Sequence, residues 1–169
     1  IMKYRQSTRF NKKISEIGFG AWQLGGTGTW GYMSKEDGVH LVLEALKEGV
    51  NFFDTAPGYA SGNSELILGE ALLEDRDTVF INTKIGHGPN GEYEFSKEGI
   101  KTSINRSLKK LQTTYLDSVI LHNPERYILE GKTDLFVELE QYKEKGIING
   151  YGVSIDSLDE LRVVLNNID

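Results

Sequence analysis

The sequence predicts an α/β fold of the (β/α)8 TIM barrel class, of which about five strand–helix units and an N-terminal hairpin are present. Short apolar runs alternate with segments of helical periodicity along the 169 residues, as parallel strands with helical crossovers require. The apolar runs end on polar or aromatic side chains at regular intervals. The fingerprint of a doubly wound nucleotide-binding sheet is missing, because no glycine-led helix follows Gly18-Phe19-Gly20.

The predicted strands come in chain order after a short opening hairpin. Residues 4–15 form this hairpin, and Asn11-Lys12-Lys13 indicates its turn. A glycine-rich loop, residues 25–31, follows the first strand of the sheet. Five apolar runs are predicted to be the strands, at residues 16–22, 50–54, 78–84, 116–121 and 147–154.

Five helices are predicted to alternate with these strands. Ser34, Ser96 and Ser157 are suitable N-caps, and Ser157 forms a capping box with Glu160. Gly49 is placed to cap the end of the first helix. The predicted helices run from Ser34 to Gly49, over residues 64–73, from Ser96 to Leu111, over residues 133–145 and from Ser157 to Leu165.

The side chains at the strand ends favour a closed barrel over an open sheet. They are Trp22, Asp54, Lys84, His122 and Ser154, at intervals of 32, 30, 38 and 32 residues. A barrel builds its active site from the C-terminal ends of several strands. Five units fall short of eight and would leave two bare parallel edges. We therefore expect residues 1–169 to be one barrel domain, incomplete at its C-terminus and truncated from a longer parent protein.

Composition and charge favour a soluble cytoplasmic protein. The net charge of -6, with no stripe of Lys and Arg, argues against nucleic acid. The absence of cysteine excludes disulfides and thiolate metal sites. No cluster of histidines or carboxylates has metal-ligand spacing, so no metal is expected. No apolar run approaches the length of a membrane span, and the first residues are too polar for a signal peptide.

Four polar residues, Asp54, Tyr59, Lys84 and His122, together predict proton transfer to a carbonyl oxygen. Each alone has a structural explanation, such as a carboxylate capping a turn or a lysine reaching solvent. On one rim, however, an ammonium stabilises a phenolate and a carboxylate holds the ammonium in place. A neutral histidine beside the phenol can orient a carbonyl oxygen. Hydride would have to come from a cofactor, because no side chain supplies it.

Several segments resemble the aldo-keto reductase family. Phe53-Asp54-Thr55-Ala56-Pro57-Gly58-Tyr59, followed by Gly62-Asn63-Ser64-Glu65, is similar to the family signature around its catalytic aspartate and tyrosine. The opening hairpin resembles the family's bottom plug, so the resemblance covers essentially the whole chain. The other matching segments are Gly18-Phe19-Gly20-Ala21-Trp22 for the first strand, Ile81-Asn82-Thr83-Lys84 for the lysine strand, Val119-Ile120-Leu121-His122 for the histidine strand and Tyr151-Gly152-Val153-Ser154 for the fifth strand.

The resemblance implies an NADPH-dependent oxidoreductase that reduces aldehydes or ketones to alcohols. Asp54, Tyr59, Lys84 and His122 would be its catalytic tetrad, with Tyr59 as the proton donor. The preference for NADPH over NADH comes from the resemblance alone, because the family's phosphate-binding loops follow the last barrel strands.

The same resemblance implies which residues contact the cofactor and the substrate. Ser154 would hydrogen-bond the nicotinamide carboxamide. The residues implied to contact NADP(H) are Gly20, Ala21, Trp22, Asp54 and Ser154, and those implied to contact substrate are Trp22, Trp30, Tyr59 and His122.

One position departs from the family pattern. Ile155 stands where the family has an asparagine after the serine, and an isoleucine cannot supply the amide contact to the nicotinamide. Asp156 comes one position later and would point to the other face of a strand. One contact with the nicotinamide is therefore unassigned.

Three alternatives remain open. A non-catalytic member of the same fold would bind nucleotide as a sensor or regulatory subunit, although the intact tetrad argues against this. A lyase or aldolase would use Lys84 as a Schiff-base nucleophile, yet such a lysine works better in an apolar site than beside a carboxylate. The third alternative is that the isolated 169 residues are an inactive fragment. We assign no role to His40 or His87, and the substrate and oligomeric state are not predicted.

Overall fold

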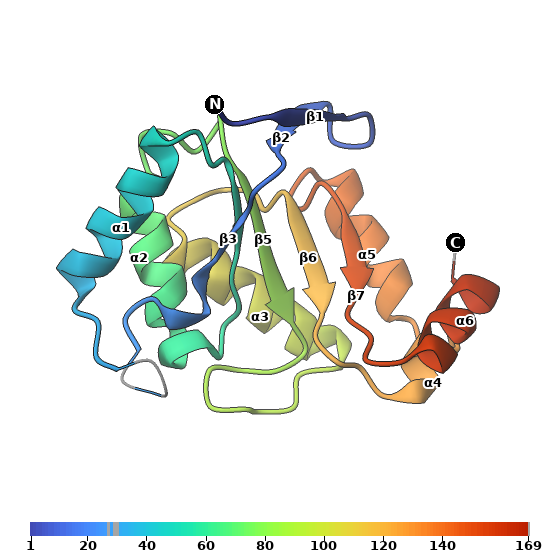
Figure 1. Cartoon of the computed structure of the whole chain (residues 1–169). Coiled ribbons are helices and arrows are strands. Elements are labelled where there is room, and N and C mark those ends of the chain that lie inside the picture. Colours follow the sequence, from blue (N-terminus) through green and yellow to red (C-terminus); the bar gives the residue numbers. More distant parts are fainter. Residues whose placement is uncertain (27, 29–30, 169) are drawn as a thin grey trace.

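The structure, a computed structural model, describes residues 1–26, 28 and 31–168 and places five parallel strands in one sheet (Figure 1). Trp30, a predicted substrate contact, lies outside these residues. Each strand pairs with the next one along the chain, as a barrel requires. In order the strands are β3 (Phe19–Gly20), β4 (Phe52–Asp54), β5 (Phe80–Ile85), β6 (Ser118–Leu121) and β7 (Tyr151–Val153).

Helices connect the parallel strands, and their predicted caps are confirmed. The hydroxyls of Ser34, Ser96 and Ser157 each accept a backbone N–H in the first turn of a helix. In the described part of the chain, no helix combines the length and apolar character needed to cross a membrane. The helices are η1 (Ala21–Gln23), α1 (Lys35–Lys47), η2 (Tyr59–Gly62), α2 (Asn63–Ala71), α3 (Lys97–Lys110), α4 (Arg126–Leu129), α5 (Leu135–Glu144) and α6 (Leu158–Asn167).

Several element boundaries differ from the prediction. The first strand was predicted over residues 16–22, but only Phe19–Gly20 pair with β4, and the chain then turns into η1. Trp22 therefore lies in a 3-10 turn and not at a strand end. The last strand was predicted to begin at residue 147, four residues before the start of β7. In this stretch Ile148 forms only an isolated bridge with Leu116. The short helices η2 and α4 were not predicted.

The N-terminal hairpin lies at the end of the sheet where the parallel strands begin (Figure 1). Strands β1 (Tyr4–Ser7) and β2 (Lys12–Ser15) are antiparallel. Lys12 Nζ lies 2.7 Å from Asp117 Oδ1, and Asp117 also binds Arg76 Nη1 at 2.9 Å. Asp117, directly before β6, is 1% exposed. A buried carboxylate with two cationic partners thus attaches the hairpin to the sheet.

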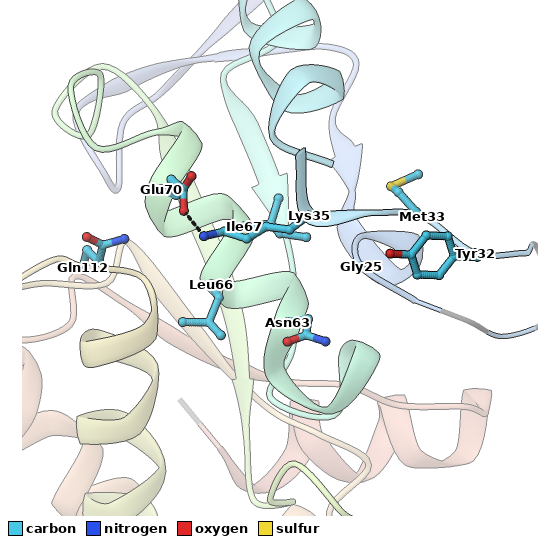
Figure 2. Close-up of a pocket in the computed structure, with 9 residues that line it drawn as sticks. All are labelled: Gly25, Tyr32, Met33, Lys35, Asn63, Leu66, Ile67, Glu70 and Gln112. Carbon is cyan, nitrogen blue, oxygen red and sulfur yellow. Dashed lines mark ion pairs between the residues drawn. The ribbon is translucent and has the colours of Figure 1, made fainter. Parts of the chain in front are cut away.

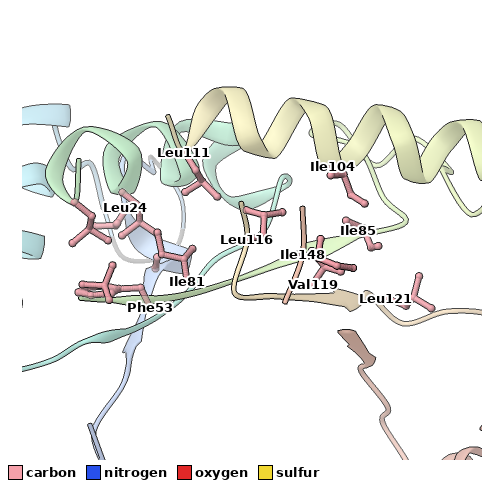
Figure 3. Packing of buried hydrophobic residues seen from close by; sticks show 14 of the residues in the cluster. Leu24, Phe53, Ile81, Ile85, Ile104, Leu111, Leu116, Val119, Leu121 and Ile148 are labelled. Atoms are coloured by element: carbon pink, nitrogen blue, oxygen red, sulfur yellow. The ribbon is translucent and has the colours of Figure 1, made fainter. Parts of the chain in front are cut away.

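The apolar core lies between the sheet and the surrounding helices (Figure 3). Successive side chains of a strand point to opposite faces. In β5, Thr83 lies on the same face as Ile81 and Ile85, which points toward the helices. Its hydroxyl donates a 2.8 Å hydrogen bond to Glu65 of α2. Asn82 and Lys84 therefore point to the other face, where the polar site forms. The core includes Ile81 and Ile85 of β5, Val119 and Leu121 of β6, Ile104 of α3, and Leu111 directly after α3.

Candidate active site

Three of the four predicted catalytic residues lie where neighbouring parallel strands end. Asp54 is the last residue of β4, Lys84 is the penultimate residue of β5, and His122 directly follows β6. The backbone N–H of His122 donates to the Ile85 carbonyl at 2.9 Å, which continues the sheet pairing to this point. The sequential strand order thus brings these side chains to one rim.

Lys84 connects the predicted carboxylate with the predicted proton donor. Its Nζ donates to Asp54 Oδ2 at 2.8 Å and to the Thr55 carbonyl at 2.9 Å. The same Nζ lies 4.7 Å from the centre of the Tyr59 ring. The Lys84 side chain is only 11% exposed, and burying an unpaired ammonium would cost several kcal/mol. The Asp54 carboxylate offsets that cost and holds the ammonium against the phenol ring.

Two further polar residues, which the sequence analysis did not identify, hold Asp54 in place. Asn82 Nδ2 donates to Asp54 Oδ1 at 2.6 Å. The Ser118 hydroxyl in turn donates to Asn82 Oδ1. The sequence feature that could have identified Asn82 is the period of two along β5. Asn82 lies two residues before Lys84, and the residues between and beside them face the helices. Both oxygens of the Asp54 carboxylate are therefore engaged.

Tyr59 is presented by a tight turn with unusual backbone conformations. Ala60 and Ser61 are left-handed, with φ values of +49° and +54°, and Gly62 follows at +92°. Left-handed conformations of non-glycine residues cost on the order of 1–3 kcal/mol each and concentrate at functional sites. Ser64, at the start of α2, fastens the turn through a 2.7 Å hydrogen bond to the Ala21 carbonyl.

The environment of His122 favours its neutral form. Burial, and after it the positive charge of Lys84, lowers the pKa of His122 below its ordinary value. The ring of His87 lies 6.1 Å away, edge-on at 77°. A neutral imidazole keeps one N–H donor, so His122 can donate a hydrogen bond to a carbonyl oxygen at neutral pH.

Tyr59 and His122 open onto a cleft of about 330 Å³ at this rim. His87, to which the sequence analysis assigned no role, contributes to its wall. Nothing in the local sequence marks His87, because the loop after β5 must fold back before this side chain reaches the cleft. The lining residues are Gly58, Tyr59, His87, Gly88, Pro89, Gly91, His122 and Asn123.

The predicted cofactor residues near β3 differ in accessibility. Gly20 is exposed, and a Cβ placed on it would have no neighbour within 4 Å. Ala21 is fully buried, and its carbonyl accepts the Ser64 hydroxyl. Trp22 is 58% exposed, but it does not line the cleft that holds Tyr59. Gly20 therefore offers an open backbone surface, whereas the Ala21 side chain is closed off.

Ser154, the predicted carboxamide contact, is paired with Asn123. The Ser154 hydroxyl accepts the backbone N–H of Asn123 at 2.7 Å and donates to Asn123 Oδ1 at 2.6 Å. Ser154 directly follows β7, and Asn123 directly follows His122. The two residues therefore extend the polar rim from β6 to β7.

A larger cavity of about 410 Å³ lies along the outer face of α2 (Figure 2). An ion pair between Lys35 and Glu70 lies across it. None of the four predicted catalytic residues lines this cavity, so the smaller cleft is the candidate active site. Within residues 1–26, 28 and 31–168, no group of His, Asp and Glu is arranged to hold a metal ion. The larger cavity is lined by Gly25, Tyr32, Met33, Lys35, Asn63, Leu66, Ile67, Glu70 and Gln112.

Comparison with known proteins identifies the fold and the relatives of this chain. A model described as the Aldo/keto reductase family matches residues 16–168. The chain is 34% identical over 160 residues to L-galactose dehydrogenase of Arabidopsis thaliana, covering 92% of this chain and 49% of that protein. It is 33% identical over 172 residues to aldo-keto reductase YhdN of Bacillus subtilis, covering 96% of this chain and 51% of that protein.

The solved structures agree with this result. The holo form of aldo-keto reductase AKR11C1 from Bacillus halodurans has a TM-score of 0.83 and 31% sequence identity, covering 99% of this chain and 55% of that one. The prediction of a partial (β/α)8 barrel is thereby confirmed. The chain spans about half the length of the curated relatives it matches.

Proposed function

Because the chain belongs to the aldo/keto reductase family, we propose that the protein containing it reduces an aldehyde or ketone to an alcohol with NADPH, and that Tyr59 is the proton donor. One observation carries the proposal above the others. Lys84 Nζ lies 2.8 Å from Asp54 and 4.7 Å from the centre of the Tyr59 ring. This contact gives the phenol a cationic neighbour that is itself held by a carboxylate.

The rim fits the nicotinamide end of NADP(H). Gly20 is exposed and pairs in register with Asp54, so the first two strands present open backbone beside a carboxylate. Ser154 presents a polar group beyond β7, on the other side of His122. Gly20, Trp22, Asp54, Ser154 and the backbone at Ala21 would hold the cofactor, which supplies hydride to the carbonyl carbon when bound.

The side chains of the rim would then handle the proton. Tyr59 donates its hydroxyl proton to the carbonyl oxygen, and the Lys84 ammonium stabilises the phenolate that remains. Asp54 keeps Lys84 in position through the 2.8 Å contact. Neutral His122 donates a hydrogen bond that orients the same carbonyl oxygen. A positioned general acid contributes about 10²- to 10⁴-fold to a rate.

Tyr59→Phe tests this assignment directly. The variant keeps the aromatic ring but lacks the acidic proton, so kcat for a panel of aldehydes should fall about 10²- to 10⁴-fold, with the NADPH dissociation constant unchanged. Tyr32→Phe, in the larger cavity along α2, is the matched control and should retain full activity. Turnover by Tyr59→Phe close to that of the unsubstituted protein would exclude Tyr59 as the proton donor.

The contacts of Lys84 also bear on the alternative Schiff-base chemistry. Its ammonium already donates to Asp54 and to the Thr55 carbonyl, whereas a nucleophilic amine needs a free lone pair. Borohydride treatment with an aldehyde should therefore leave no adduct on Lys84. An adduct there, found by mass spectrometry, would favour a lyase. Nucleotide binding without turnover of any aldehyde in the panel would favour a regulatory protein.

A further inference from the structure

We propose that Asn123 and Ser154 together bind the carboxamide of the nicotinamide ring, with Asn123 donating to the carboxamide oxygen and Ser154 accepting from its NH2 group. This inference rests on the proposed function, because it requires a nicotinamide cofactor. It assigns to Asn123, which directly follows His122 after the end of β6, the amide contact that Ile155 cannot make.

The hydrogen bonds between the two residues fix which of their atoms remain available. The Ser154 hydroxyl has one proton, which it donates to Asn123 Oδ1 at 2.6 Å in preference to the more distant Leu121 carbonyl at 3.4 Å. Its oxygen accepts the Asn123 backbone N–H at 2.7 Å and keeps one further lone pair. Asn123 Oδ1 already accepts the hydrogen bond from Ser154. Among the described residues, no acceptor forms a hydrogen bond with Asn123 Nδ2. The pair therefore offers one acceptor and one amide donor side by side.

A primary carboxamide has the complementary pattern. It presents a carbonyl oxygen and an NH2 group on the two arms of one plane. The Asn123 donor matches the first arm, and the Ser154 acceptor matches the second. Two hydrogen bonds to one planar group also fix the rotation of the ring to which that group is attached, so the pair would select the face that is turned toward the substrate.

The placement of Asn123 connects this contact with the catalytic rim. Asn123 is exposed and lines the same cleft as Tyr59 and His122. Its φ of +49° lies in the left-handed region, which asparagine tolerates better than most residues. The backbone bond to Ser154 holds this conformation. The residue that orients the carbonyl oxygen and the residue that binds the carboxamide are thus consecutive.

The test is a binding measurement on the full-length protein, with NADPH titrated against tryptophan fluorescence. Asn123→Leu is close in volume and lacks the amide, and it should weaken NADPH binding about 2- to 10-fold, the effect of one hydrogen bond. Binding of adenosine 2′,5′-bisphosphate, which has no nicotinamide, should not change. Asn105→Leu, on the exposed face of α3, is the control and should match the unsubstituted protein.

A cofactor analogue separates the two contacts. The 3-acetylpyridine analogue of NADPH keeps the carbonyl oxygen and replaces the NH2 group by a methyl. Asn123→Leu should weaken binding of this analogue by the same factor as it weakens NADPH, because Asn123 holds the oxygen. An unequal factor would overturn the assigned pairing.

The remaining outcomes distinguish this inference from the proposed function. Unchanged NADPH binding in Asn123→Leu would overturn the inference and leave the reductase proposal standing. Equal weakening of NADPH and of the bisphosphate would also overturn it, because the effect would then be general damage. If the unsubstituted protein binds neither NADPH nor NADH, both the inference and the proposed function are wrong.

Discussion

Lys84 shows how a single residue acquires its proposed role from its neighbours. Its strand position brings the ammonium to the rim. There the ammonium donates hydrogen bonds to Asp54 and to the Thr55 carbonyl, and it lies against the Tyr59 ring. An exposed lysine with one carboxylate partner would contribute little, because surface ion pairs are worth about 0–1 kcal/mol. Burial makes this contact specific.

Lys84→Met should separate the chemical role of this residue from its structural role. We expect kcat for aldehyde reduction to fall by about 10²-fold or more, because the phenolate of Tyr59 loses its counter-charge. The free energy of unfolding should fall by less than the roughly 3–5 kcal/mol of a broken buried pair, since Asp54 is 33% exposed and keeps its bond to Asn82. Steady-state kinetics and urea titration measure the two effects. Activity within threefold of the unsubstituted protein would exclude Lys84 from proton transfer.

His122 should make the protein less stable in mild acid. Its pKa in the folded state is lowered, first by burial and then by Lys84, whereas the unfolded chain takes up a proton near pH 6.5. The stabilising contribution is therefore present above pH 6.5 and is lost as the pH falls toward the lowered value. Urea titrations between pH 7.5 and 5 should show a decline that is smaller in His122→Asn. An equal decline in both proteins would mean that other groups cause it.

The sequence was sufficient for some site residues and insufficient for others. Asp54, Lys84 and His122 could be located because each lies at or next to the end of an apolar strand, and the parallel order brings those ends together. Asn82 was missed because its role depends on which strands flank β5. His87 was missed because only the folded loop carries it to the cleft. The roles proposed for the tetrad await the substitutions described above.

At the scale of single elements, the loop between β5 and α3 is held by a close contact at its first glycine. Gly86 has φ of +102°, and a Cβ there would lie 2.1 Å from the Phe95 ring. Phe95 in turn packs edge-on against His87, with ring centres 5.0 Å apart. Arg106 of α3 binds both carboxylate oxygens of Glu94 at 2.8 Å. The loop wall of the cleft is therefore an ordered part of the fold.

Gly86→Ala should disturb this loop more than Gly91→Ala. Both glycines have positive φ, but a Cβ on Gly91 would have no neighbour within 4 Å. The two variants share the conformational cost, so the difference between them isolates the collision with Phe95, about 1–3 kcal/mol. Urea unfolding measures the difference, and substrate KM reports on the cleft wall. Equal stability of the two variants would show that Phe95 moves away at no cost.

The elements themselves were predicted in the correct order, with errors at their ends. The serine caps defined where three helices begin, because a side chain bonds a specific backbone N–H in each. The first strand was predicted too long, because apolar residues in η1 look like strand residues in a short window. Helix α4 has four residues, barely one turn, and leaves no periodicity to detect.

At the scale of the whole molecule, Asp117 couples the hairpin to the sheet. Besides Lys12 and Arg76, its carboxylate accepts the Ile81 backbone N–H at 3.0 Å. Asp117→Ala would leave two cations and one N–H without this partner, and we expect a loss of about 3–5 kcal/mol in unfolding free energy. Hydrogen exchange should show the hairpin amides exchanging faster.

The control for this prediction lies in the same hairpin. Glu16 pairs with Arg5 at 2.9 Å, but the Arg5 side chain is 82% exposed. Glu16→Ala should therefore cost at most about 1 kcal/mol. Comparable losses in the two variants would mean that the burial of Asp117 has no special weight.

The polar chain from Ser118 through Asn82 and Asp54 to Lys84 also acts as a check on how the strands assemble. Strand β5 contributes Asn82 and Lys84 to it, and β6 and β4 contribute one residue each, Ser118 and Asp54. If β5 paired one residue out of step, Lys84 would turn into the apolar layer and Thr83 would lose Glu65. Sheets with the wrong register are thus destabilised by buried charge as well as by lost packing. A protein that turns over substrate must therefore have paired these strands in the correct register.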